Sequence, residues 1–171
     1  MLDWDVPPHP HEEIRHDRDP RAPGADVIPF AVAVVVTLAA RLLGLAVPAL
    51  DAWPPAVAIG LAAGFALAAS AHFVEPRCSG LIAIVPPRVP RADLVVTATG
   101  LLEVAGAIGL LIPPLRTPAA IGLAILLVAV LPANVRAAGG RRHPAAPTTP
   151  LPLRAAVQAG YLLGCAVVVL G

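Results

Sequence analysis

The stretch Ala92–Ile112 reads ADLVVTATGLLEVAGAIGLLI, and it is long and apolar enough to cross a membrane as one helix. Its only charged residues are Asp93 at the start and Glu103 near the middle. A helix needs about 20 apolar residues to cross the hydrocarbon core of a bilayer. We therefore predict a transmembrane helix, with Glu103 about 16 Å deep at about 1.5 Å per residue.

Four other stretches share this length and apolar character. They are residues 27–50, 52–74, 118–135 and 153–171. Of the 171 residues 57% are hydrophobic and 13% are charged, whereas soluble domains carry roughly 25% charged residues. The predicted fold class is therefore all-α, a polytopic membrane protein with five spans. A charged side chain inside such a span is expected to have a structural or functional reason.

The segment before the first span is polar and rich in acidic residues. We predict that residues 1–26 form a disordered cytoplasmic tail. Its histidines His9, His11 and His16 lie on no helix that would fix their spacing, so no metal site is expected there. The two cysteines form no CxxC motif and are interpreted as free thiols. The net charge of +1 gives no indication of nucleic-acid binding.

Arginines predict the orientation of the chain, because short cytoplasmic loops carry an excess of basic residues. With five spans, the side that holds the N-terminal tail carries Arg15, Arg18, Arg21, Arg77, Arg88, Arg91, Arg136, Arg141, Arg142 and Arg154. The other side carries Arg116 alone. We therefore predict a cytoplasmic N-terminus and an external C-terminus. Heavy use of alanine, valine, proline and arginine suggests a GC-rich bacterial genome, and hence the bacterial inner membrane.

Prolines predict where helices begin, bend and end. Thr117 and Pro118 are interpreted as the N-cap and first position of the fourth span. Pro132 is expected to kink or end that span near its cytoplasmic end. Residues 75–91 are predicted to be a loop with a stiff extended run, and residues 137–152 a flexible loop.

Glu103 is the most informative polar residue inside a span. Its helical face carries Thr99, Gly100, Gly106 and Ala107 at spacings of three and four residues. Small residues let helices approach closely in lipid, so Glu103 is predicted to face a helix contact. Two roles stay open: an interhelical hydrogen bond, or contact with a ligand or proton. For Arg41 in the first span the alternatives are snorkelling to the outer surface and an ion pair with Glu103.

Two further spans carry patterned residues. Gly60 and Gly64 have a GxxxG spacing, which is typical of close packing within the subunit or, alternatively, of a homo-oligomer. The last span has a polar stripe on one face, formed by Arg154, Gln158, Tyr161 and Cys165. Lipid-facing helices rarely carry such a row, so this face is predicted to meet the bundle interior.

These residues predict a polar pocket that opens toward the cytoplasm between spans two to five. His72 is either a hydrogen-bonded interfacial residue or a ligand contact. The candidate pocket residues are Glu103, His72, Thr99, Asn134, Arg136, Arg154, Gln158 and Tyr161. The candidate helix-packing residues are Gly60, Gly64, Gly100 and Gly106. The sequence contains no metal-ligand spacing, phosphate loop or nucleophile–base motif, so no catalytic residue or metal is predicted.

Several of these motifs, taken in order, resemble the DoxX-like family of small bacterial membrane proteins. They are Ala71-His72-Phe73, Val85-Pro86-Pro87 with Pro90, the run from Thr99 to Leu111, Arg116, Pro132-Ala133-Asn134-Val135, and Pro152-Leu153-Arg154 with Gln158. The resemblance covers residues 56–170. Leu131 stands where many relatives have phenylalanine. The resemblance implies a four-helix transmembrane domain over residues 52–171, to which residues 27–50 add one N-terminal helix.

The resemblance also implies a setting, because the family takes its name from a subunit of a thiosulfate:quinone oxidoreductase. Some relatives are tied to membrane thiol-redox complexes, and the family has no agreed active residues. The expected function is therefore a non-catalytic subunit or scaffold of a membrane redox or stress-response complex. Two alternatives are a quinone- or lipid-binding component of a membrane oxidoreductase, and a small-solute or proton transporter. The expected partners are the lipid bilayer and such a complex, with no cofactor other than a quinone.

Overall fold

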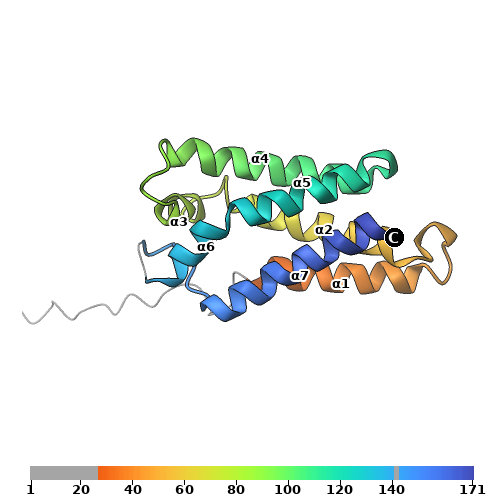
Figure 1. Ribbon diagram of the computed structural model, residues 1–171. Coiled ribbons are helices and arrows are strands. Elements are labelled where there is room, and N and C mark those ends of the chain that lie inside the picture. The colour runs from red at the N-terminus through yellow and green to blue at the C-terminus, as the bar shows by residue number, and fades with distance from the viewer. Residues whose placement is uncertain (1–26, 141–142) are drawn as a thin grey trace, which may run out of the picture.

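The computed structural model describes residues 27–140 and 143–171, and within these ranges the chain is helical and contains no strand (Figure 1). The α-helices are α1 (Ile28–Leu43), α2 (Trp53–Ser70), α3 (Arg77–Ile84), α4 (Ala92–Leu111), α5 (Arg116–Ala129), α6 (Leu131–Ala138) and α7 (Leu151–Leu170). Two short 3₁₀ helices, η2 (Pro48–Leu50) and η3 (Pro113–Leu115), lie in connections. The predicted tail and its histidines lie outside the described residues.

The five longer helices run side by side, and the two short ones lie together at one end. Helix α2 packs against α1, α4 and α7, while α5 packs against α4 and α7. Helices α3 and α6 contact each other at the end opposite the C-terminus (Figure 1). We call this region the α3/α6 end.

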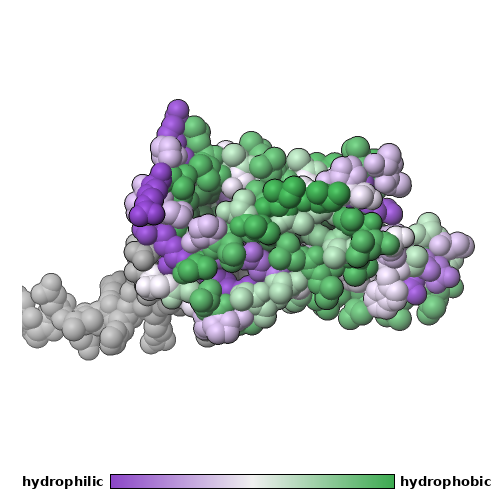
Figure 2. Space-filling view, in the orientation of Figure 1, coloured by the Kyte–Doolittle hydropathy of each residue, from purple (hydrophilic) through white to green (hydrophobic). Residues whose placement is uncertain are grey.

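Three helices are long and apolar enough to cross a membrane, namely α2, α4 and α7. The bent pair α5–α6 makes a fourth when it is counted as one span. Hydrophobic residues cover most of the visible length of the bundle, and hydrophilic residues gather at the α3/α6 end (Figure 2). The described residues therefore hold three or four such spans, against the five that we predicted.

The difference arises in the first predicted span, where helix α1 has 16 residues and ends at Leu43. The chain then turns so tightly that a Cβ atom on Gly44 would lie 2.8 Å from the carbonyl carbon of Leu50. Glycine is suited to such close backbone approach because it has no side chain. Apolar composition continued to residue 50, but it could not reveal this turn.

Pro132 breaks the fourth predicted span, as expected. Helix α5 ends at Ala129, and α6 begins at Leu131 with a bend of about 40°. Proline lacks the N–H that would continue the helical hydrogen bonds and clashes with the preceding turn. The predicted cap at the other end of this span is wrong, because α5 already begins at Arg116 and has no side-chain cap.

Both predicted cytoplasmic loops are more ordered than expected. Residues 75–91 contain helix α3, and in the second loop Ala145, Ala146 and Thr149 are buried. Ile84, Ala137 and Ala146 form a small apolar cluster that joins α3, α6 and this loop. Local composition predicted a stiff extended run in the first loop and flexibility in the second, but packing between the two loops decides their conformation.

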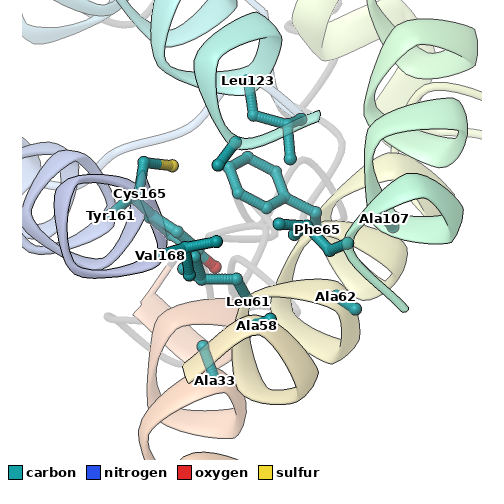
Figure 3. Packing of buried hydrophobic residues seen from close by; sticks show 12 residues of the cluster. Ala33, Ala58, Leu61, Ala62, Phe65, Ala107, Leu123, Tyr161, Cys165 and Val168 are labelled. Carbon is teal, nitrogen blue, oxygen red and sulfur yellow. The ribbon is translucent and has the colours of Figure 1, made fainter. Parts of the chain in front are cut away.

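The core is built from small side chains and close helix contacts. Its largest fully buried side chains are Leu110, Leu123 and Cys165, which lie among many alanines (Figure 3). A Cβ on Gly106 would lie 2.6 Å from the Leu123 side chain. In lipid, helices associate through close packing of small residues because no hydrophobic force between them remains. Polar groups gather instead at the α3/α6 end, outside this core.

Candidate functional site

A cavity of about 470 Å³ lies at the α3/α6 end of the bundle. Its wall comes from the start of α1, from α2 to α7 and from residues 145–149. Most of the wall is apolar, with Leu67, Val96 and Leu127 among its members. Its polar side chains are His72, Arg77, Thr99, Glu103, Asn134, Thr149, Arg154, Gln158 and Tyr161.

The structure brings seven of the eight predicted pocket residues to this one cavity. They are His72, Thr99, Glu103, Asn134, Arg154, Gln158 and Tyr161. Arg136 lies on α6 and is not part of the cavity wall. Thr99 turns its hydroxyl back to its own helix and donates to the carbonyl of Val95.

His72 and Glu103 face each other across the contact between α2 and α4. The Nδ1 atom of His72 lies 2.7 Å from the carbonyl oxygen of Val96. A carbonyl can only accept, so Nδ1 carries hydrogen and Nε2 is the atom turned toward Glu103. Nε2 lies 3.5 Å from Oε2 of Glu103, and the side chains are only 11% and 14% exposed. The two groups are close enough to form an ion pair when the histidine is protonated.

Gly100 makes this approach of α2 and α4 possible. A Cβ atom on Gly100 would lie 2.6 Å from the Cβ of His72 and 2.9 Å from the ring of Phe73. Any larger residue would push the end of α2 away from α4. The face of small residues around Glu103 thus contacts the end of α2, and His72 lies at this contact.

A second polar group joins α6 and α7 on another part of the wall. Asn134 donates to Oε1 of Gln158 at 3.1 Å and accepts from Nη1 of Arg154 at 3.3 Å. Nε2 of Gln158 donates to the carbonyl of Leu127 at 2.9 Å. The last carbonyl groups of a helix lack intrahelical partners, and Leu127 lies in the last turn of α5. The amide of Gln158 therefore satisfies a group that the helix break leaves open.

Tyr161 extends the polar wall toward the core. Its ring packs between Phe30 and Phe65, with centroid distances of 5.3 Å and 4.8 Å. A Cβ on Gly64 would lie 2.8 Å from the hydroxyl of Tyr161 and 2.9 Å from the carbonyl oxygen of Pro29. The hydroxyl has no hydrogen-bond partner among the described residues, and neither does Oε2 of Glu103.

Arg41 lies far from this site, in the last turn of α1. Its Nη1 atom donates to the carbonyl of Leu50 at 2.9 Å and lies 3.5 Å from Asp51. Its guanidinium stands 5.2 Å from the ring of Trp53. The predicted ion pair with Glu103 is therefore wrong, and the alternative of a side chain directed to the helix end agrees with these contacts.

Sequence reasoning missed several parts of the wall. Arg77 and Thr149 reach the cavity from segments that were predicted to be loops. The carbonyl groups of Val96 and Leu127 are main-chain partners, which no residue pattern identifies. The helix break at Pro132 was a usable signal for the second of these, because it exposes carbonyl groups in the preceding turn.

The described residues contain no group of three or more histidine, cysteine or acidic side chains that could hold a metal ion. Cys78 and Cys165 are both free thiols. What the arrangement can do is hold a small molecule that is apolar over most of its surface and polar at a few points. Cavities of about 300–1,000 Å³ with mainly apolar walls and a few placed polar groups are typical ligand sites.

Fold and site together define a helical protein with three or four segments long and apolar enough to cross a membrane, and with an amphipathic cavity at one end of the bundle. The chain belongs to a family described as a domain of unknown function (DUF8561), whose model matches residues 61–168. This region begins inside α2 and leaves out α1. No curated protein and no solved structure matches the chain.

Proposed function

We propose that this chain is a multi-pass protein of the bacterial inner membrane whose cavity binds a quinone- or lipid-like molecule. The observation that carries the proposal is the cavity itself, because its wall combines apolar residues with polar groups from α2, α4, α6 and α7. A hydrocarbon or ring body would contact the apolar wall. An oxygen-bearing head group would contact the polar side chains.

Mass spectrometry of the gently extracted protein tests this proposal. We expect a bound apolar molecule to copurify with the wild type and to be largely lost in Glu103→Ala. Thr97→Ala is the matched control, because Thr97 lies on the same helix but is not part of the cavity wall. Its exposed hydroxyl donates a hydrogen bond to the main-chain carbonyl of Asp93. Equal content of the bound molecule in wild type and Glu103→Ala would contradict the proposal.

We further propose that α2, α4, α5–α6 and α7 form a four-helix transmembrane bundle, beside which α1 is an added N-terminal helix. In this arrangement the α3/α6 end faces the cytoplasm. Its support is the arginine distribution, since Arg77, Arg88 and Arg91 belong to the connection that holds α3, and Arg136 lies on α6.

Cys78 offers a direct test of this orientation. It lies on α3 and is partly exposed, whereas Cys165 is buried in the core. A membrane-impermeant maleimide should therefore label inverted vesicles and spare intact spheroplasts. Cys78→Ser is the control that should remove the signal. Labelling from the outer side alone would overturn the orientation.

The resemblance to DoxX-like proteins supports a place in a larger assembly. The chain would then be a non-catalytic subunit of a membrane redox or stress-response complex, with its cavity as the ligand-holding part. Purification in mild detergent, followed by identification of the copurifying chains, tests this role. Recovery of the chain alone, at native expression levels, would count against it.

A further inference from the structure

Two buried oxygen atoms on the cavity wall have no hydrogen-bond partner among the described residues, although one of them lies 3.5 Å from Nε2 of His72. They are the hydroxyl oxygen of Tyr161 and Oε2 of Glu103. Tyr161 is 6% exposed. Buried polar groups in native proteins nearly always have a hydrogen-bond partner, so two such atoms on one wall indicate a missing occupant.

The two groups differ in their hydrogen-bonding capacity, because one can donate and the other can accept. A tyrosine hydroxyl donates one hydrogen bond and can accept others, and a carboxyl group keeps an acceptor lone pair in either protonation state. The Tyr161 hydroxyl and the Glu103 carboxyl line the same cavity. The pairing of His72 with Val96 holds Nε2 on one side of Oε2. The other side of the carboxyl group remains available to a ligand.

We infer that the inner part of the cavity recognises a hydroxyl group, which donates to Glu103 and accepts from Tyr161. This inference rests on the proposed ligand-binding function and narrows its ligand class. A phenol, a quinol or a long-chain alcohol can satisfy both protein groups with one oxygen. A carbonyl or ether oxygen can only accept, so it can pair with the Tyr161 hydroxyl but not with an ionised Glu103 carboxylate.

The rest of the ligand is apolar. The apolar part of the cavity wall includes Val96, Leu127 and Val157. A ring or alkyl chain attached to the hydroxyl would pack against this surface. A purely polar molecule such as a sugar would leave many of its groups unpaired there.

The test compares para-decylphenol with its methyl ether, which differ in the hydroxyl hydrogen and one methyl group. Binding to the full chain in detergent micelles is measured by isothermal titration. We expect the phenol to bind about tenfold more tightly than the ether, as one buried hydrogen bond predicts. Glu103→Ala should remove most of this preference, because it removes the acceptor of the phenol hydrogen. Tyr161→Phe should weaken the binding of both compounds, because the phenol and ether oxygens both accept from the Tyr161 hydroxyl. Thr97→Val, which removes an exposed hydroxyl on α4, should leave it unchanged.

The possible outcomes separate the two proposals. Equal affinity of phenol and ether for the wild type would overturn the hydroxyl inference and leave the ligand-binding function standing. Failure of both compounds to bind would overturn both, and would indicate that water fills the cavity. A preference that survives in Glu103→Ala, or binding of the phenol to Tyr161→Phe as tight as to the wild type, would also overturn the inference. The comparison in the wild type needs no variant, so it remains decisive if a substitution impairs folding.

Discussion

The two ends of the bundle are packed in different ways by the same helices. Around Leu110 and Leu123 the helices meet through alanine and glycine, and the core closes on apolar side chains. At the α3/α6 end, a cavity is lined by His72 just after α2, Glu103 on α4 and Gln158 on α7. Small residues allow close approach in both regions, and at the α3/α6 end long polar side chains line the cavity beside such a contact.

This difference has an energetic meaning in a membrane. Lipid tails are as apolar as a leucine side chain, so a closed core gains stability from tight contact. A polar end cannot gain stability in this way and relies on side-chain hydrogen bonds instead. The core end should therefore be sensitive to volume, whereas the cavity end should be sensitive to hydrogen-bonding groups.

The largest effect is expected from Gly60→Leu in the closed part of the bundle. A Cβ at this position would meet the carbonyl of Ala33 and the side chain of Thr37 on α1. Because backbone has to move, we expect a loss of about 3 kcal/mol or more in the free energy of unfolding. Titration with sodium dodecyl sulfate measures it. Gly122→Leu is the matched control, since nothing lies within 4 Å of its Cβ position. Equal stability of the two variants would contradict the packing described for α1 and α2.

The next effect compares two leucines that are truncated to alanine. Leu123 is fully buried, so Leu123→Ala should lose about 2–5 kcal/mol through the space it leaves in the core. Leu67 lines the cavity and is 37% exposed, so Leu67→Ala should lose about 1 kcal/mol or less. The same detergent titration measures both variants. A cost at Leu67 as large as at Leu123 would show that the cavity wall is packed like the core.

A smaller effect is expected from Gln158→Leu at the cavity end. The change removes the hydrogen bonds to Asn134 and to the carbonyl of Leu127 while it keeps the side-chain volume. Interhelical hydrogen bonds in membranes contribute about 0.6 kcal/mol on average and up to about 1.7. We therefore expect a loss of about 1 kcal/mol. A double-mutant cycle with Asn134→Leu should give a coupling energy different from zero, and additive effects would contradict the contact.

The smallest effect is expected at the far connection, from Asp51→Asn. Arg41 lies 3.5 Å from Asp51, whose side chain is 65% exposed. Exposed ion pairs contribute about 0–1 kcal/mol, and Arg41 keeps its hydrogen bond to the carbonyl of Leu50. We expect a change of less than about 0.5 kcal/mol. A larger loss would mean that this pair, and not the backbone contact, holds the α1–α2 connection.

Long apolar segments made much of the helical fold predictable. The predicted spans at 52–74, 92–112 and 153–171 correspond to α2, α4 and α7, and the bend at Pro132 was expected. The early end of α1 and the helix in residues 77–84 were not. Both depend on contacts with distant residues, such as that of Gly80 with Ala145, which local composition does not contain.

The candidate site was predictable in its members and unpredictable in its pairings. Helical periodicity placed Glu103 on a small face and Gln158 on a polar stripe, and both line the cavity. Periodicity gave no means to choose between Arg41 and His72 as the neighbour of Glu103. That choice depends on which helices lie side by side, because a helix face has several possible partners.

The sequence by itself determined that the chain is helical, that several segments are long and apolar enough to cross a membrane, and which polar residues share a helix face, because each is a property of one segment. Only the tertiary structure decided three other features. His72 approaches Glu103 beside Gly100, the connections that hold α3 and residues 145–149 pack against each other, and Tyr161 and Glu103 line the same cavity. Each of these features is a contact between segments that lie apart in the sequence. The size of the side chains where two helices meet sets how closely the polar atoms of those helices approach each other.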